Sequence, residues 1–356
     1  MPKKDTPMST NPRWKNRPEG SNWGEFGPDD QLGRLNLLTP EQVKKGMAEV
    51  KEGIPFCLSL PLDYPGEAKV NPRRHPPKLQ PTLRDGKPNL NFPLRLTNRS
   101  LIDVISDDAA LIHLQYSTQW DSFAHVGQEF DADGDGRAEM VYYNGFRAWE
   151  HIIGPIEYRD GDEIPRPHAP GATKLGIENM AEKCVQGRAV MIDLLTHYGW
   201  DRTVVGYDQL MRAMDADGVT VEPGDMVCLR TGYSDVILSM NKKPDAAKLE
   251  RSCATLDGRD ERLLQWITDS KLVALIADNY AVEQQPALDT TDDPCCSLPL
   301  HAHCLFKLGV HLGEIWHLSP LADWLRAHRR YRFLLTAPPL RLPGAVGSPA
   351  NAIGTV

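Results

Sequence analysis

The segment LIHLQYSTQWDSFAHVGQEFDADGDGRAEMVYYNG, from Leu111 to Gly145, carries the pattern that decides most about fold and site. Four of its polar residues are spaced two apart: Gln115, Ser117, Gln119 and Asp121. Strand side chains alternate between faces, so a strand would present all four on one face, which a helix cannot do. His125 follows Asp121 by four residues. If Asp121 caps a first helical turn, that turn would direct His125 to the same side as Asp121. Amide oxygens, a carboxylate and an imidazole are therefore predicted to converge.

Downstream of this segment, apolar runs bounded by Gly, Pro or Asp predict buried strands over 187–195, 225–233 and 271–278. Apolar residues at helical spacing predict helices within 203–218, 260–271 and 319–330. Strands that alternate with helices indicate an α/β or α+β domain.

Upstream, residues 1–22 are polar and aperiodic, which predicts a flexible N-terminal arm. Thr39 and Pro40 are suited to the N-cap and first position of a helix that ends near Val50. The Pro-rich composition of 64–93 favours an extended surface loop. No internal repeat or shift in composition divides the rest, so residues 23–356 are expected to form one domain.

Charge and cysteine usage exclude several classes of protein. The chain has 40 Lys and Arg against 48 Asp and Glu, a formal charge of −8 that would repel a phosphate backbone, so nucleic acid is not expected as a partner. Seven cysteines, odd in number and without a CxxC pair, indicate reduced thiols rather than a disulfide framework. No apolar run is long enough for a signal segment or a membrane span, so we expect a cytoplasmic protein that does not bind membranes.

Residues 115–125 resemble the signature H-x-G-T-H-x-D-x-P-x-H of the metal-dependent cyclase family, which includes bacterial kynurenine formamidase and isatin hydrolase. The ungapped match falls on Thr118, Asp121 and His125, while Gln115 and Gln119 stand where the family has histidine ligands. Four other segments are similar to the family: WGEFGPDDQLGRLNLLTPE, VEPGDMVCLRTGY, LPLHAHCLFKLGVHLGEIWHLSPLADWL and PLRLPGAVGSPANAIG. The resemblance covers about residues 23 to 352.

The resemblance implies an α/β fold of the swivelling β/β/α type with a mixed central sheet, assembled as a homo-oligomer, a dimer or tetramer, with arms exchanged between subunits. It implies metal ligands at Asp121, His301 and Glu314, with His303 competing with His301. His125 would be the proton shuttle. Trp23, Thr118 and His303 would lie on the substrate side, Trp23 stacking on a planar ring. Gly309 is placed to end a helix begun near His301, before a strand that carries Glu314.

Glutamine at two ligand positions changes the expected metal. An amide oxygen is neutral and hard, so Gln115 and Gln119 disfavour Zn²⁺ and favour Mn²⁺ held by mixed oxygen and nitrogen donors. Alternatively, the two glutamines hold substrate and no metal is needed.

The resemblance therefore implies an amidohydrolase-like enzyme that opens an amide, lactam, ester or lactone bond in a small ring-bearing molecule. Two alternatives stay open: a metal-independent cyclase, dehydratase or isomerase that uses Gln115 and Gln119 to hold substrate, and a non-catalytic small-molecule-binding relative. Asp278 and Glu283 follow a predicted strand and are candidates for lining the pocket. DADGDG, from Asp131, lacks the twelfth-position Glu of a calcium loop and is expected to form an acidic turn.

Overall fold

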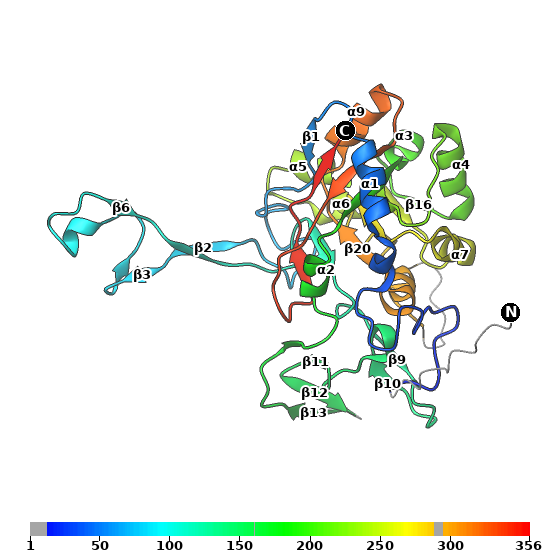
Figure 1. Cartoon of the computed structure of the whole chain (residues 1–356), viewed down its shortest axis with the longest axis horizontal. Helices are drawn as coiled ribbons and strands as arrows, with labels where there is room; N and C mark the ends of the chain where they lie inside the picture. The colour runs from blue at the N-terminus through cyan, green and yellow to red at the C-terminus, as the bar shows by residue number, and fades with distance from the viewer. Residues whose placement is uncertain (1–12, 160, 288–294) are drawn as a thin grey trace.

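A mixed sheet of nine strands forms the centre of the computed structural model, which describes residues 13–159, 161–287 and 295–356 (Figure 1). The strands lie in this order: β1 (Pro55–Cys57), β23 (Ile353–Thr355), β21 (Arg332–Thr336), β15 (Gln186–Asp193), β17 (Met226–Arg230), β19 (Ala274–Ala277), β20 (His311–Glu314), β8 (Gln119–Asp121) and β22 (Gly347–Pro349). The four from β15 to β20 are mutually parallel and the flanking pairs are antiparallel. The carboxyl ends of the parallel strands therefore share one edge, where α/β proteins place their sites.

The two faces of the sheet bury separate apolar clusters because strand side chains alternate. Val190 and Ile192 of β15 belong to the cluster that contains residues of α4 (Tyr207–Asp217) and α7 (Glu261–Ser270). Ala189 and Met191 point the other way, into the cluster with residues of α9 (Ser319–Ala327). Helix α1 (Pro40–Ala48) packs on β15 and β21.

These elements confirm the predicted α/β alternation. The strands expected over 187–195, 225–233 and 271–278 are β15, β17 and β19, and the three expected helices are α4, α7 and α9. The helix expected from Pro40 is α1, with Thr39 at its N-cap position. The other central elements are η1 (Gly33–Leu37), α2 (Glu178–Glu182), α3 (Leu194–Tyr198), β16 (Thr203–Val205), α5 (Tyr233–Ser239), α6 (Ala246–Glu250), β18 (Ala254–Leu256), α8 (Pro299–His301) and the π-helix η4 (Ala302–Leu308). None of the described helices is long and apolar enough to cross a membrane.

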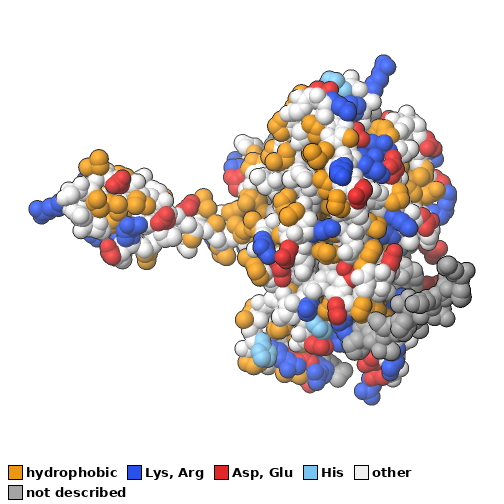
Figure 2. All heavy atoms as spheres, in the orientation of Figure 1, with side chains coloured by type: hydrophobic (Ala, Val, Ile, Leu, Met, Phe, Trp, Pro, Cys, Tyr) orange, Lys and Arg blue, Asp and Glu red, His pale blue; other side chains and the backbone are white. Residues whose placement is uncertain are grey.

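A long hairpin arm projects from the body, cyan in Figure 1. Its paired segments are β2 (Lys78–Pro81) with β7 (Asp108–Leu111), β3 (Leu83–Arg84) with β4 (Lys87–Pro88), and β5 (Phe92–Pro93) with β6 (Val104–Ile105), with η2 (Leu94–Leu96) near the tip. The loop expected over 64–93 is therefore largely the outgoing limb of this arm, whose prolines the sheet edge tolerates. Apolar side chains cover much of the arm's visible face in Figure 2.

A smaller region below the sheet consists of short ribbons: β9 (Gln128–Phe130) with β10 (Glu139–Val141), η3 (Tyr143–Gly145), β11 (Ile152–Ile153) with β14 (Gly171–Ala172), and β12 (Ile156–Arg159) with β13 (Asp162–Pro165). The chain from residue 13 to 22 lies against it, with the N–H groups of Lys15 and Asn16 donating to Ala132 O. Residues 1–12 lie outside the described part of the chain. Residues 13–22 thus contact this region, and the flexibility expected of the N-terminal arm stays a prediction.

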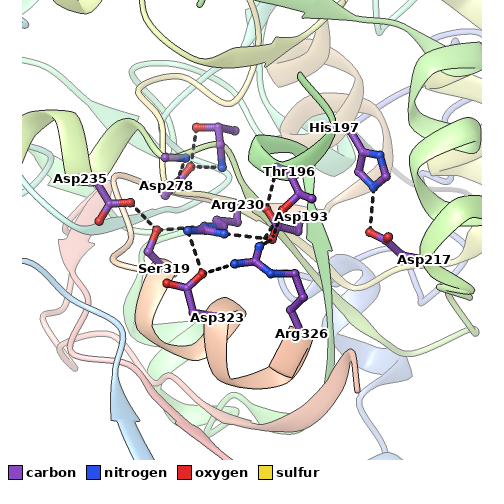
Figure 3. Close-up of polar contacts among 12 residues, drawn as sticks. Asp193, Thr196, His197, Asp217, Arg230, Asp235, Asp278, Ser319, Asp323 and Arg326 are labelled. Atoms are coloured by element: carbon purple, nitrogen blue, oxygen red, sulfur yellow. Dashed lines mark hydrogen bonds and ion pairs between the residues drawn. The ribbon is translucent and has the colours of Figure 1, made fainter. Parts of the chain in front are cut away.

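Charged side chains at the carboxyl ends of β15 and β17 bind one another and helix α9 (Figure 3). Arg230 donates to Asp193 at 2.9 Å and to Ser319 at 3.0 Å, and Arg326 reaches the same Asp193 at 2.6 Å. Asp278 accepts hydrogen bonds from Thr231 and from the Gly232 N–H. These carboxylates therefore have partners already and hold the scaffold together.

Candidate functional site

Strands β20 and β8 place three polar side chains on one face of the sheet. Glu314 is directly opposite Gln119, and Asp121 follows two residues later on the same face. Between them Trp120 points to the opposite face and joins the other apolar cluster. The Gln119 amide donates to Glu314 Oε2 at 3.2 Å. All three polar side chains are buried, so their charges and dipoles act in a medium of low polarity.

His301 reaches the same place from α8 and is held there by Glu283. The Glu283 carboxylate accepts from the Leu300 N–H at 2.9 Å, from the His301 N–H at 2.9 Å and from His301 Nδ1 at 2.7 Å. This leaves His301 Nε2 facing Glu314 Oε1 at 3.2 Å. The left-handed Gly309 ends η4, and the chain enters β20, as the sequence predicts.

The Asp121 carboxylate has no hydrogen-bond partner for either oxygen among the described residues, although it is completely buried. Gln119 Oε1 is also without a partner. One ligand atom each of Asp121, His301 and Glu314 lies within 4.8 Å of the other two. Buried acceptors without donors are costly, and a cation is the group that would satisfy several oxygens and one imidazole nitrogen together. The donor set therefore fits a divalent cation.

Electrostatic coupling in this cluster is strong. Burial raises the pKa of Asp121, since the charged form loses its hydration. For His301, burial acts to lower the pKa, but hydrogen bonds to Glu283 and Glu314 outweigh it and raise the pKa to about 10. Burial likewise opposes ionisation of Glu314, but the hydrogen bond from His301 keeps the pKa of that carboxyl below its usual value.

His125 is a partly exposed neighbour of the cluster. Its Nε2 lies 3.8 Å from Asp121 Oδ1, and its side chain is 23% exposed while that of Asp121 is fully buried. The segment after Asp121 is a turn closed by the His125 N–H to Ser122 O at 3.0 Å, where we expected a helical turn capped by Asp121. The turn still directs His125 to the Asp121 side.

Gln115 and Ser117 are not part of the strand, which begins at Gln119. The predicted single face of four polar residues is therefore corrected to Gln119 and Asp121. The Gln115 side-chain amide lies against Gly347, and Ser117 Oγ is 3.5 Å from Pro61 O. Strand β8 begins only at Gln119 because its pairing with the neighbouring strands β20 and β22 begins at that residue.

Three other expected site residues have structural partners. Trp23 is fully buried among Trp14, Phe130 and Phe306, and its indole N–H donates to Phe306 O at 2.8 Å. Thr118 Oγ1 donates to Ile315 O and accepts from the Leu60 N–H. His303 Nε2 contacts Thr268 Oγ1 at 2.9 Å, on α7. Of the two competing histidines, the structure brings only His301 to Glu314.

The DADGDG segment forms the expected acidic turn. Asp131 accepts from the N–H groups of Gly134, Asp135 and Gly136. Asp131, Asp133 and Glu139 each offer an oxygen within 4.8 Å of the others, but Glu139 is already paired with Arg147 at 2.7 Å. These side chains are half-buried on the surface ribbon, away from the β8 and β20 strands.

Sequence reasoning did not single out Arg74. This residue lies at the root of the arm, is half-buried, and donates from Nη1 to Gln115 O at 2.7 Å. Its charge acts on the pKa of both Asp121 and Glu314, lowering each. Nothing in the Pro-rich composition around Arg74 marks it, because its proximity to the strands depends on how the arm joins the body.

Comparison with known proteins gives a family for the chain. The family model described as "Putative cyclase" matches residues 58–284. A crystal structure described as a novel cyclase is 30% identical, with a TM-score of 0.71 and coverage of 94% of this chain and 97% of that one. None of the curated proteins matches.

Two isatin hydrolases show similarity of fold alone. Isatin hydrolase A from Labrenzia aggregata, bound to benzyl benzoate, is 12% identical, with a TM-score of 0.52 and coverage of 88% of this chain and 97% of that one. Isatin hydrolase A from Ralstonia solanacearum is 14% identical, with a TM-score of 0.51 and coverage of 85% and 91%.

Proposed function

The chain belongs to the cyclase family, and from that premise we propose that it is a hydrolase that opens an amide, lactam, ester or lactone bond in a small ring-bearing molecule. The isatin hydrolases, whose overall fold is similar, support this reaction class by analogy. The observation that carries the proposal is the buried Asp121 carboxylate, which has no donor among the described residues and lies beside His301 and Glu314.

Asp121, His301 and Glu314 would hold a divalent cation, with Gln119 Oε1 as an additional oxygen ligand. A mixed set of hard oxygens and one imidazole suits Mn²⁺ better than Zn²⁺. Such a cation supplies Lewis-acid chemistry, polarising a carbonyl and acidifying water. Glu283 would serve as the carboxylate that fixes the tautomer of His301, since it already binds Nδ1 and leaves Nε2 directed at the cluster.

His125 is the residue we assign to proton transfer. Its imidazole is the most exposed of the site side chains, so it can contact both a substrate and solvent. An imidazole can accept a proton at one ring nitrogen and donate one, so it can take a proton from water and pass it to the leaving group. Asp121, at 3.8 Å from Nε2, is placed to orient the ring.

A turnover assay tests the proposal. Protein purified without chelator is offered formanilides, cyclic imides and aryl lactones, before and after removal of divalent ions and after addition of Mn²⁺. We expect hydrolysis of at least one class, lost on chelation and restored by Mn²⁺. Hydrolysis that persists at the same rate in the chelated protein would contradict the role of the cation.

One contact favours a second candidate. His301 Nε2 already meets Glu314 Oε1 at 3.2 Å, and Gln119 meets Glu314 Oε2, so part of the cluster is closed without a cation. A metal-independent cyclase, dehydratase or isomerase would keep this arrangement and use the Gln119 carbonyl oxygen towards substrate. The chelation arm of the same assay distinguishes the two.

We also propose that the chain assembles as a homo-oligomer through its arm. Isolated two-stranded ribbons are marginal in water, and this one leaves apolar side chains such as Leu79, Leu83 and Ile102 largely exposed. A second copy of the chain that covers the arm would remove this exposure.

A further inference from the structure

Arg74 places a positive charge at the edge of the candidate site, where it acts on Asp121 and Glu314. Only Nη1 of its guanidinium has a hydrogen-bond partner in the described part of the chain, the carbonyl oxygen of Gln115, and no carboxylate there forms an ion pair with it. A half-buried guanidinium normally engages a carboxylate or phosphate through its paired N–H groups. The remaining N–H groups of Arg74 are therefore available to an anion.

The fold fixes Arg74 in this position. Residues 71–74 form a turn closed by the Arg74 N–H to Asn71 O at 3.1 Å, and Asn71 Oδ1 accepts from the Arg73 N–H. The Asn71 amide also donates to the Tyr280 hydroxyl at 3.1 Å. The Arg74 guanidinium lies 5.9 Å from the centre of the Tyr280 ring. The arm root is thus attached to the loop that follows β19.

A cavity of about 240 Å³ lies beside this loop. Its lining includes Tyr280, Tyr233, Glu283, Lys69 and Arg202. Tyr280 connects the cavity to Arg74, and Glu283 connects it to His301, because the same carboxylate that lines the cavity holds the imidazole. The wall of the cavity therefore contains Tyr280, whose ring lies near the Arg74 guanidinium, and Glu283, which binds His301.

We propose that the substrate is a ring-bearing carboxylate whose carboxylate binds Arg74 while its ring occupies this cavity against Tyr280. The claim that this molecule is hydrolysed rests on the proposed function, whereas the claim that its carboxylate binds Arg74 does not. A planar carboxylate attached to a ring matches both the planar guanidinium of Arg74 and the aromatic ring of Tyr280 beside it. Arg74 thereby determines specificity and does not take part in bond cleavage.

The first test compares matched substrates. Formanilide is neutral, and the 2-, 3- and 4-formamidobenzoates add one carboxylate to it. We expect Arg74→Gln to lower the ratio of kcat/KM for the best formamidobenzoate to that for formanilide by roughly 10- to 100-fold. Arg74→Lys should lower this ratio less than Arg74→Gln does, because lysine keeps the charge but lacks the paired N–H groups. An unchanged ratio in Arg74→Gln overturns the proposal.

A control separates recognition from disturbance of the arm root. Arg73 is exposed and neighbours Arg74 in the same turn. Arg73→Gln removes the same charge from the same segment and should keep the wild-type ratio. A loss in Arg73→Gln equal to that in Arg74→Gln would show a general effect of charge and overturn the assignment to Arg74.

A binding measurement keeps the test independent of catalysis. Benzoate and benzamide are titrated calorimetrically into the wild type and into Arg74→Gln. We expect benzoate to bind the wild type at least 10-fold more tightly than benzamide, and the variant to lose this preference. If no formanilide is hydrolysed but benzoate shows the expected preference, the proposed reaction fails and the anion site stands. Equal binding of the two probes by the wild type overturns the anion site, whatever the turnover.

Discussion

The Asp121 carboxylate and its neighbour His125 show how position in the fold assigns different properties to two residues four apart. Asp121 is fully buried with no donor for either oxygen among the described residues, whereas His125 keeps 23% of its side chain exposed. A buried carboxylate is suited to binding a cation and an accessible imidazole to moving protons. The proposed division of roles follows from this difference in burial.

Replacing His125 by alanine should abolish turnover and leave the fold intact. General acid–base catalysis contributes about 10²- to 10⁴-fold in rate, so a loss of this size is expected in kcat, with an unchanged far-ultraviolet circular dichroism spectrum. His168→Ala, at an exposed position between β13 and β14, serves as the control. A His125→Ala variant that turns over at a near-normal rate would exclude the proton-transfer role.

Replacing Glu283 by glutamine should weaken cation binding without removing a proposed ligand. The amide keeps one acceptor oxygen, which can still accept from the His301 N–H, but its NH2 group replaces the oxygen that faces the Leu300 N–H, and it lacks the charge that fixes the tautomer of His301. Loss of such a supporting carboxylate is expected to lower metal affinity by about 10- to 100-fold. Titration with Mn²⁺, followed by electron paramagnetic resonance, measures this directly. Wild-type affinity in Glu283→Gln would show that the carboxylate has no part in the site.

At the scale of elements, the parallel strands were predictable and the short strand β8 was only partly so. Long apolar runs such as 187–195 indicate strands because both faces of a central parallel strand are buried. The two-residue spacing of Gln119 and Asp121 was informative because strand side chains alternate between the two faces of a sheet. Gln115 could not be placed, since the sequence does not show where neighbouring strands begin to pair with β8.

The segment before β17 ties three elements together through one carboxylate. Glu222 contacts Arg188 of β15 at 2.7 Å, Arg332 of β21 at 2.7 Å and Lys45 of α1 at 3.3 Å. The hydrogen bond from Arg188 lowers the pKa of Glu222 to about 2. A carboxyl whose pKa is depressed in the folded state stabilises it fully above the unfolded value of about 4.3, and this stabilisation disappears as pH falls towards 2.

We therefore expect Glu222→Gln to lower the melting temperature at pH 6, with a difference from the wild type that shrinks as pH falls from 4.5 to 3. The effect should be modest, about 1 kcal/mol or less, because the Glu222 side chain is 41% exposed and solvent screens the pairs. Melting followed by circular dichroism at several pH values measures it, with Glu163→Gln as an exposed control. A difference that grows on acidification would contradict the assignment.

For the whole molecule, the family resemblance predicted the fold and the composition did not predict the arm. Proline-rich sequence is typical of loops, and an extended ribbon that leaves the body satisfies the same composition. The resemblance also suggested Trp23 as a substrate contact, whereas the structure buries it in the core. Arg74 escaped notice because only the tertiary contact between arm and body brings it near Asp121 and Glu314.

Shortening the arm should reduce the size of the assembly. Lys78 and Leu111 are cross-strand partners, so residues 79–110 can be replaced by Asn-Gly, a two-residue turn that suits a hairpin. The body should still fold, since its apolar clusters contain no residue of this segment. Light scattering coupled to size exclusion should find an oligomer for the full chain and a monomer for the shortened one. An equal number of chains per assembly in the full and shortened proteins would rule out the arm as the contact between subunits.

The central claim, that Asp121, His301 and Glu314 hold one divalent cation, is tested most directly by the stoichiometry of Mn²⁺ binding to the wild type and to Asp121→Asn. The substitution keeps the shape of the side chain and removes the buried charge. We predict about one Mn²⁺ per wild-type chain and none per Asp121→Asn chain, with the variant folded as judged by circular dichroism. A wild type that binds no Mn²⁺, or an Asp121→Asn variant that binds it equally well, would contradict the account.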